Sequence, residues 1–197
     1  MKVRSRSRTS RRSARALSPS SPRSSTRGSI TRARPLLKSG GGLSRSGDVP
    51  ATSVASTERN HGLRSTTLKA FLRRALRILG FPRASVSLVL TSDERIRTLN
   101  RDFLETDRPT DVLSFPLADP GDLEDRGREL FLGEIYISVD TARAQARAAR
   151  RPYRREVAHL AIHGLLHLLG YDHATAAARR RMTAIESRLL REAAPML

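Results

Sequence analysis

Four histidines lie within a short segment near the end of the sequence, HLAIHGLLHLLGYDH. His159, His163 and His167 follow one another at intervals of four residues, so on a helix they would project from one face about one turn apart. Gly170 would end that helix, and the turn after it can bring His173 back toward the same point. Because imidazoles one turn apart can share a cation, this spacing predicts a metal site.

The ligand set favours zinc, held by His163, His167 and His173. Three neutral imidazoles leave a fourth position for water, which is the arrangement of a catalytic zinc site rather than a closed structural one. Such an ion lowers the pKa of its water and polarises a bound ester or phosphoryl oxygen. We therefore expect one Zn²⁺ per chain and a metal-bound water as the catalytic group, with His159 as a further candidate outside the ligand set.

Gly164 directly follows the first of these ligands. Zinc proteases of the His-Glu-x-x-His type carry their general base at that position, so the sequence argues against a peptidase mechanism. Glycine inside a helix costs about 1 kcal/mol relative to alanine and is tolerated where a side chain would block close packing or the approach of a ligand. Packing is the simpler of these two explanations.

The elements that must position the histidines are indicated by the hydrophobic pattern from about residue 64 onward. Ser92 is a suitable N-cap, with acidic residues in the turn that follows it. We expect helices at 68–79, 92–103, 152–169 and 174–190, further helical residues after position 140, and strands at 84–90, 111–117 and 130–139. This pattern predicts an α+β fold with a small mixed β-sheet packed with several helices, the metal-binding helix lying near the C-terminus.

The composition excludes several classes of protein. The chain has no cysteine, which excludes a disulfide framework, a thiolate nucleophile and an iron–sulfur cluster. It also has no apolar run of the roughly 18 residues that a membrane-spanning helix needs, so we expect no membrane partner. Any metal must therefore be held by His, Asp or Glu.

The net charge of +18 is concentrated in residues 1–60, which hold 14 Lys or Arg against Asp48 and Glu58. Repeated Arg and Ser with almost no periodic apolar residues predict a disordered extension ending in a linker, followed by a metal-dependent enzyme domain at 61–197. One interpretation of the extension is a nucleic-acid-binding arm. An organelle transit peptide and an extension without function are the other two.

The segment HGLLHLLGYDH resembles the signature of the YbeY family of bacterial metallo-endoribonucleases, which mature ribosomal RNA. LNRDFLETDRPTDVLSFPL at 99–117 and LGEIYIS at 132–138 resemble the same family in the same order, and the resemblance covers about residues 65–192. It implies zinc ligands at His163, His167 and His173.

The same resemblance implies single-strand-specific endoribonuclease activity in the 3′-end maturation of small-subunit (16S-type) rRNA and in ribosome quality control. The implied partners are single-stranded RNA, small-subunit rRNA and the ribosome or ribosomal proteins. The implied location is the cytoplasm, or an organelle if the basic N-terminus is a transit peptide.

The chain departs from the family pattern at Leu104, where members often carry a cleft arginine. Arg101 and Arg108 are candidates to bind substrate in its place, and Glu134 replaces the more common Asp. Asp172 would either orient a histidine or shape the turn. Two further functions stay open, namely an RNA-binding ribosome-assembly factor with a structural zinc and a metal hydrolase of another substrate.

Overall fold

A mixed sheet of four strands organises the chain in the computed structural model, which describes residues 51–58 and 62–193. The strand order is β1-β2-β4-β3, with β1 and β4 parallel to β2 and with β3 antiparallel to β4. The strands are β1 (Ser53–Ser56), β2 (Ala84–Thr91), β3 (Val112–Pro116) and β4 (Leu130–Ser138).

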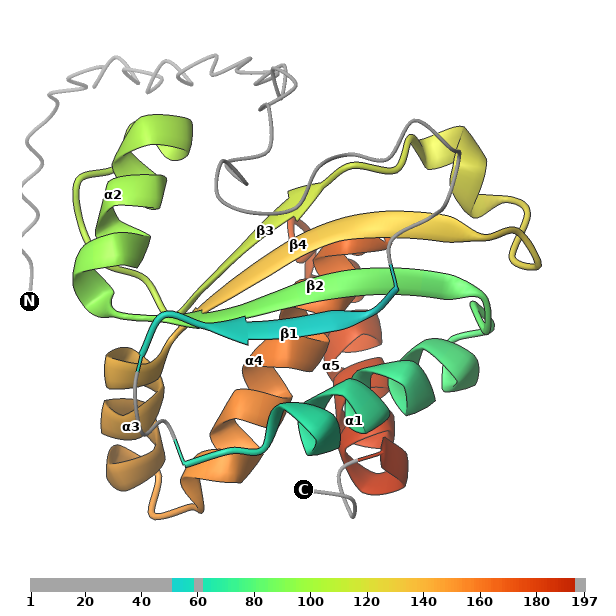
Figure 1. Ribbon diagram of the computed structural model, residues 1–197. Coiled ribbons are helices and arrows are strands. Elements are labelled where there is room, and N and C mark those ends of the chain that lie inside the picture. The colour runs from blue at the N-terminus through green and yellow to red at the C-terminus, as the bar shows by residue number, and fades with distance from the viewer. Residues whose placement is uncertain (1–50, 59–61, 194–197) are drawn as a thin grey trace, which may run out of the picture. The chain divides into compact units, whose positions relative to one another are not determined.

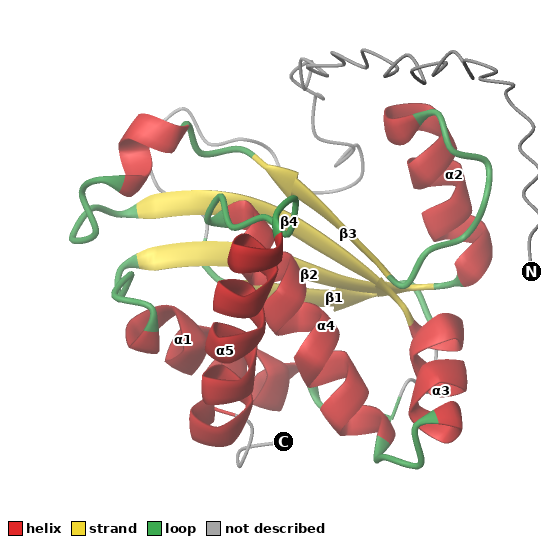
Figure 2. Cartoon of the chain, turned by 180° about the vertical axis from the view of Figure 1, so that it is seen from behind, coloured by secondary structure: helices red, strands yellow, loops and turns green. Residues whose placement is uncertain are grey.

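Within the described part of the chain, five α-helices pack around this sheet, with α1, α4 and α5 on one face and α2 against the other (Figures 1 and 2). The helices are α1 (Ser65–Ile78), α2 (Asp93–Leu104), α3 (Val139–Ala148), α4 (Tyr153–Leu168) and α5 (Ala176–Ala193), with a short 3₁₀ helix η1 (Pro120–Leu123) before β4. The predicted α+β class with a small mixed sheet is therefore confirmed. Among the described residues, no helix is both long and apolar enough to cross a bilayer.

The face of the sheet toward α1, α4 and α5 carries the main core, and β4 shows how the sequence builds it. Leu130 and Leu132 point into this core, as do Ile135 and Ile137, so the alternation slips by one residue between the two pairs. The slip is a β-bulge at Gly133. Ser85 and Ser87 are two positions apart on β2, whereas their partners on β4, Phe131 and Glu134, are three positions apart. Gly133 has a φ of 138°, and a Cβ there would lie 2.1 Å from the Phe115 carbonyl oxygen.

The other face of the sheet holds a smaller core under α2, formed by Ile96, Leu99, Leu113 and Tyr136. The ring of Phe115 lies edge-on to Phe103 and to Tyr136, with centroid separations of 5.2 and 5.7 Å. The Tyr136 hydroxyl donates to the Glu134 carboxylate at 3.0 Å, and burial together with this carboxylate raises the pKa of Tyr136 to about 12. The Glu134 side chain therefore lies on the face of the sheet that packs against α2.

The ends of the helices follow local sequence signals. Ser92 caps α2, because its side chain accepts a hydrogen bond from the backbone N–H of Arg95 as predicted. Ser138, the last residue of β4, caps α3 in the same way by accepting from Thr141. Pro152 occupies the N-cap position of α4. These short connections fix α4 relative to the sheet.

Strand β1 corrects the predicted domain boundary. Ser53–Ser56 pairs in parallel with Ser87–Leu90, although these residues lie inside the segment 1–60 that we expected to be disordered. The strand was missed because it is a four-residue edge strand in which Val54 is the only large apolar residue. The folded part therefore begins before residue 61, while residues 1–50 of the expected extension lie outside the described residues.

Candidate metal centre

Helix α4 presents its histidines on the one face that the core does not cover. Most of its residues are buried, whereas His159, His163 and His167 are only partly buried. The helix is apolar nearly all round because it lies between the sheet and α5, so the histidine face is the exception along its length. The predicted helical register of the histidines is therefore the one observed.

Three of the histidines converge, and we call His163, His167 and His173 the histidine group. One ring nitrogen from each lies within 4.8 Å of the others, and the Nε2 atoms of His163 and His167 are 3.0 Å apart. The His173 ring centroid lies 6.0 Å from that of His163 and 5.3 Å from that of His167. Among the described residues this is the only cluster of potential metal ligands in which all the donors converge in this way.

The loop after α4 brings His173 back, as the sequence predicted. Gly170 adopts a φ of +80°, which glycine tolerates and which reverses the chain at the end of the helix. The backbone N–H of Tyr171 then donates to the carbonyl oxygen of Leu166 at 3.0 Å. The Asp172 carboxylate accepts from the backbone N–H of Ala174 at 3.2 Å, so Asp172 shapes the turn and does not contact a histidine.

Glu186 on α5 holds His163 in place. Its carboxylate lies 2.7 Å from His163 Nδ1, which directs Nε2 of the same ring toward His167. Burial alone would raise the pKa of Glu186, but the hydrogen bond from His163 and the neighbouring histidines outweigh it and hold that pKa below its usual value. A metal-binding histidine usually donates its other ring N–H to a carboxylate, which fixes the orientation of the ring.

Burial also favours the neutral form of one histidine in the group, His167. Burial, with smaller contributions from His163 and His173, lowers the pKa of His167 below its ordinary value. His167 is therefore neutral near pH 7, and a neutral imidazole is the form that binds a metal.

These residues fit a zinc ion. Tetrahedral coordination at Zn–N distances near 2.0–2.1 Å separates two ligand nitrogens by about 3.3 Å. The His163–His167 distance of 3.0 Å is close to this value, and the 4.8 Å limit for the whole group leaves His173 a small adjustment to make. Since His173 is exposed on a loop, it has the freedom to make it.

His159 lies one turn before the histidine group and outside it. Its ring centroid is 6.5 Å from that of His163, and its Nδ1 is 3.8 Å from the carboxylate of Glu156. Glu156 is almost fully buried and forms an ion pair with Arg151. His159 therefore belongs to a second polar cluster on the same face of α4.

Comparison with known proteins identifies the family. The family model described as Endoribonuclease YbeY matches residues 54–194. The chain belongs to the YbeY family. The YbeY endoribonuclease of Heliobacterium modesticaldum is 44% identical over 121 residues, which cover 57% of this chain and 73% of that protein. The YbeY endoribonuclease of Syntrophotalea carbinolica is 39% identical over 139 residues, which cover 69% of this chain and 91% of that protein.

One solved structure is also similar. A solution structure from Thermotoga maritima shows 25% identity and a TM-score of 0.49, and the match covers 72% of this chain and 90% of that one. The family assignment rests on the sequence matches above, and they confirm the expectation of an RNA-cleaving family.

The position at which the family resemblance led us to expect an arginine is the end of α2. Leu104 is the last residue of that helix and is 56% exposed. Arg101 is exposed and pairs with its neighbour Asp102 at 3.0 Å, and Arg108 is exposed on the loop before β3. Within the described residues, no hydrogen bond or ion pair joins Arg101 or Arg108 to the histidine group.

Sequence reasoning missed two carboxylates, Glu186 and Glu156. Glu186 lies in a buried stripe of α5 with Met182 and Leu189, and a single acid in such a stripe is the signal that could have revealed it. Glu156 precedes His159 by three residues and so shares its helix face, which is a similar signal. Neither pattern identifies its partner, because Glu186 meets His163 only through the packing of α5 on α4.

Proposed function

We propose that this chain is a zinc-dependent endoribonuclease specific for single-stranded RNA, acting in small-subunit rRNA 3′-end maturation and in ribosome quality control. The observation that carries the proposal is the convergence of three histidine nitrogens within 4.8 Å in a chain of the YbeY family. Zinc is the proposed ion because three imidazoles suit it and leave a position open for substrate or water.

A zinc ion held by the histidine group would supply Lewis acidity toward a phosphoryl oxygen and lower the pKa of water. The chain's own residues prepare this site. Glu186 orients His163 through its Nδ1, and burial keeps His167 neutral. Gly164, rather than a carboxylate, directly follows His163. On the same face of α4, the turns before His163 carry His159 and buried Glu156.

Single-stranded RNA suits this metal site better than duplex RNA does. An unpaired strand can bend to bring one phosphodiester to the metal, whereas an A-form duplex offers its phosphates on a rigid surface. The chain also carries an excess of basic residues over acidic ones, which favours a polyanion.

The test is metal analysis of the full-length protein beside an RNA cleavage assay, with wild type and His167→Ala purified in parallel. We expect wild type to hold about one zinc per chain and to cut single-stranded RNA in preference to duplex RNA. His167→Ala should lose both zinc and cleavage. Equal cleavage by the two proteins would point to a contaminating nuclease and overturn the proposal.

A second function, an RNA-binding ribosome-assembly factor with a structural zinc, is favoured by Leu104, an exposed uncharged side chain where the resemblance led us to expect an arginine. Tight RNA binding without cleavage by zinc-replete wild-type protein would select this alternative. A third, hydrolysis of another substrate by the same metal, would be selected if a small ester were cut and RNA spared.

A further inference from the structure

The start of α5 lies beside the histidine group and is strongly basic. Arg179, Arg180 and Arg181 are consecutive and exposed, and none of them forms an ion pair with a described residue. Elsewhere on the described surface, Arg83, Arg97 and Arg128 are each neutralised by a carboxylate. The three arginines of α5 therefore present uncompensated positive charge.

The position of this end of α5 is fixed at three points. Thr175 caps the helix by accepting from the backbone N–H of Ala178 at 3.1 Å. Glu186, further along the helix, contacts His163 at 2.7 Å. Between these points the guanidinium of Arg181 lies over the ring of Tyr171, 5.9 Å from its centroid.

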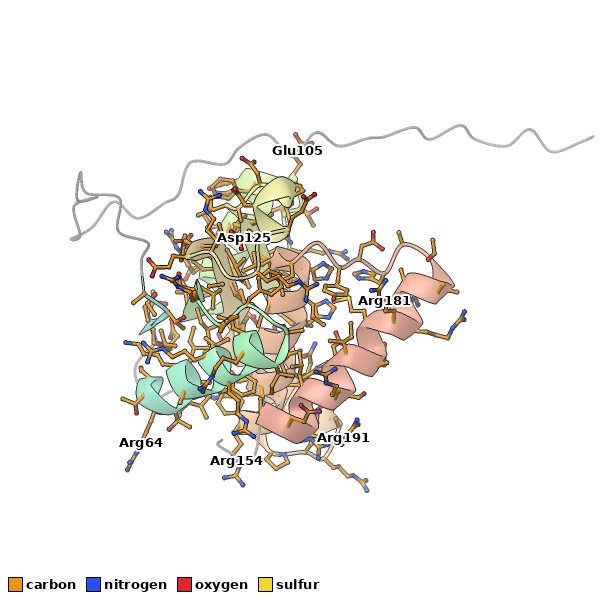
Figure 3. The ribbon with its side chains drawn as sticks, turned by 90° about the vertical axis from the view of Figure 1, so that its right-hand side faces the viewer. Arg64, Glu105, Asp125, Arg154, Arg181 and Arg191 are labelled. Atoms are coloured by element: carbon orange, nitrogen blue, oxygen red, sulfur yellow. The ribbon has the colours of Figure 1, made fainter. Side chains whose placement is uncertain are left out.

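These contacts place Arg181 at the rim of the metal centre. Tyr171 is two residues before His173, and its backbone N–H donates to the carbonyl oxygen of Leu166, the residue before His167. Arg181 is five residues from Glu186, a rise of about 7.5 Å along the helix. Figure 3 shows Arg181 on the part of α5 next to the loop that follows α4, with Arg191 near the opposite end of the helix.

Arg181 is also suited to a phosphate by its chemistry. A guanidinium stacked on an aromatic ring keeps its edge N–H groups free, and these groups match two phosphate oxygens. Because the Tyr171 ring restricts the side chain, less conformational entropy is lost when a phosphate binds. Arg181 therefore differs from a surface lysine surrounded only by water, and also from an arginine whose charge is neutralised by a carboxylate.

We infer that Arg181 is a substrate-binding residue that holds a backbone phosphate of the RNA strand next to the phosphodiester at the histidine group. This inference rests on the proposed function, and it identifies Arg181 as the positive charge that binds the RNA substrate beside the metal site. In this chain the cation comes from α5, whereas the end of α2 carries the uncharged side chain of Leu104.

The test compares Arg181→Gln, Arg181→Lys and the control Arg191→Gln in the zinc-loaded full-length chain. Arg191 is also exposed on α5 but lies about 15 Å further along the helix, so its substitution changes the net charge equally without touching the site. The probe is a short single-stranded 2′-O-methyl RNA, checked on a gel for integrity, and its Kd is measured by fluorescence anisotropy at several salt concentrations.

We expect Arg181→Gln to raise Kd roughly fivefold and to reduce the salt dependence by about one phosphate contact. Arg181→Lys should recover only part of the affinity, because an ammonium keeps the charge but cannot match two phosphate oxygens. Arg191→Gln should stay within about twofold of wild type. Zinc content should be equal in all four proteins.

Equal rises in Kd for Arg181→Gln and Arg191→Gln would show a general charge effect and overturn the inference, as would unchanged Kd or loss of zinc in Arg181→Gln. Failure of the proposed function looks different. In that case wild type would bind the probe in an Arg181-dependent manner while leaving unmodified RNA uncut.

Discussion

The three histidines of the proposed metal site are held to different degrees. His163 is fixed by Glu186, His167 is partly buried on α4 with its Nε2 3.0 Å from that of His163, and His173 is exposed on a loop. Two ligands are thus preorganised on a helix, and the third completes the site by a small loop movement. A site of this kind loses little entropy on binding zinc while keeping one side open to a substrate.

Removing any member of the histidine group should abolish stoichiometric zinc. His163→Ala, His167→Ala and His173→Ala each leave two imidazoles, too few to retain the ion through purification. His159→Ala is the matched control, since His159 lies on the same helix face but 6.5 Å from His163 between ring centroids, and it should keep about one zinc. Elemental analysis of the four variants decides this, and zinc loss from His159→Ala would make His159 a ligand.

Glu186→Gln should weaken zinc binding roughly tenfold while leaving the fold intact. The amide keeps a hydrogen-bond acceptor for His163 Nδ1 but removes the negative charge that makes this imidazole a stronger ligand. Competition with a chromophoric chelator measures the affinity. Glu192→Gln, an exposed substitution on the same helix, should bind zinc like wild type, and equal affinities of the two variants would contradict a role for Glu186.

At the scale of elements, the site depends on how closely α4 approaches the sheet. A Cβ at Gly164 would lie 2.7 Å from Ile135 Cγ2 and 2.9 Å from the Ser114 hydroxyl oxygen, which donates to the Gly164 carbonyl at 3.2 Å. Both neighbours sit on strands near the backbone and cannot move aside without shifting α4. The interpretation of Gly164 as a packing residue is confirmed.

Gly164→Ala should therefore lower the free energy of unfolding by about 1–2 kcal/mol, because overpacking outweighs the roughly 1 kcal/mol that alanine contributes to helix propensity. Denaturant unfolding measures the change, and zinc affinity should fall with it as the helix shifts. Gly121→Ala provides the control, since an added Cβ there meets nothing within 4 Å. A Gly164→Ala protein more stable than wild type would contradict this prediction, because it would show that the sheet accommodates the added Cβ.

The sequence could predict elements whose signals are local. Helical periodicity, the Ser92 cap and the glycine at position 170 placed the helices to within a few residues, and the histidine spacing predicted their convergence. Strand β1 was beyond this reasoning, because its four residues become a strand only by pairing with β2. The contact of Glu186 with His163 was equally hidden, since it depends on the packing of α5 against α4.

At the scale of the whole molecule, charge is divided unequally along the chain. Residues 1–50 contain 13 Lys or Arg against a single acid, Asp48, so they carry two thirds of the net charge of +18. The described residues, which include the sheet and the histidine group, are much closer to neutral. Deletion of residues 1–50 can therefore test whether their charge contributes to RNA affinity without removing the proposed metal site.

Deleting residues 1–50 should leave zinc content and the cleavage rate at saturating RNA unchanged, because β1 and the rest of the sheet stay intact. The cut belongs before residue 51 rather than at the predicted boundary of 60, which would remove β1. If the basic segment binds RNA, affinity at low salt should fall, and the slope of log Kd against log salt should flatten by about 0.7 for each phosphate that the shortened protein no longer neutralises. Titration of one single-stranded RNA with both proteins at several salt concentrations measures this. An unchanged slope would exclude an RNA-binding arm and leave the transit-peptide and non-functional interpretations.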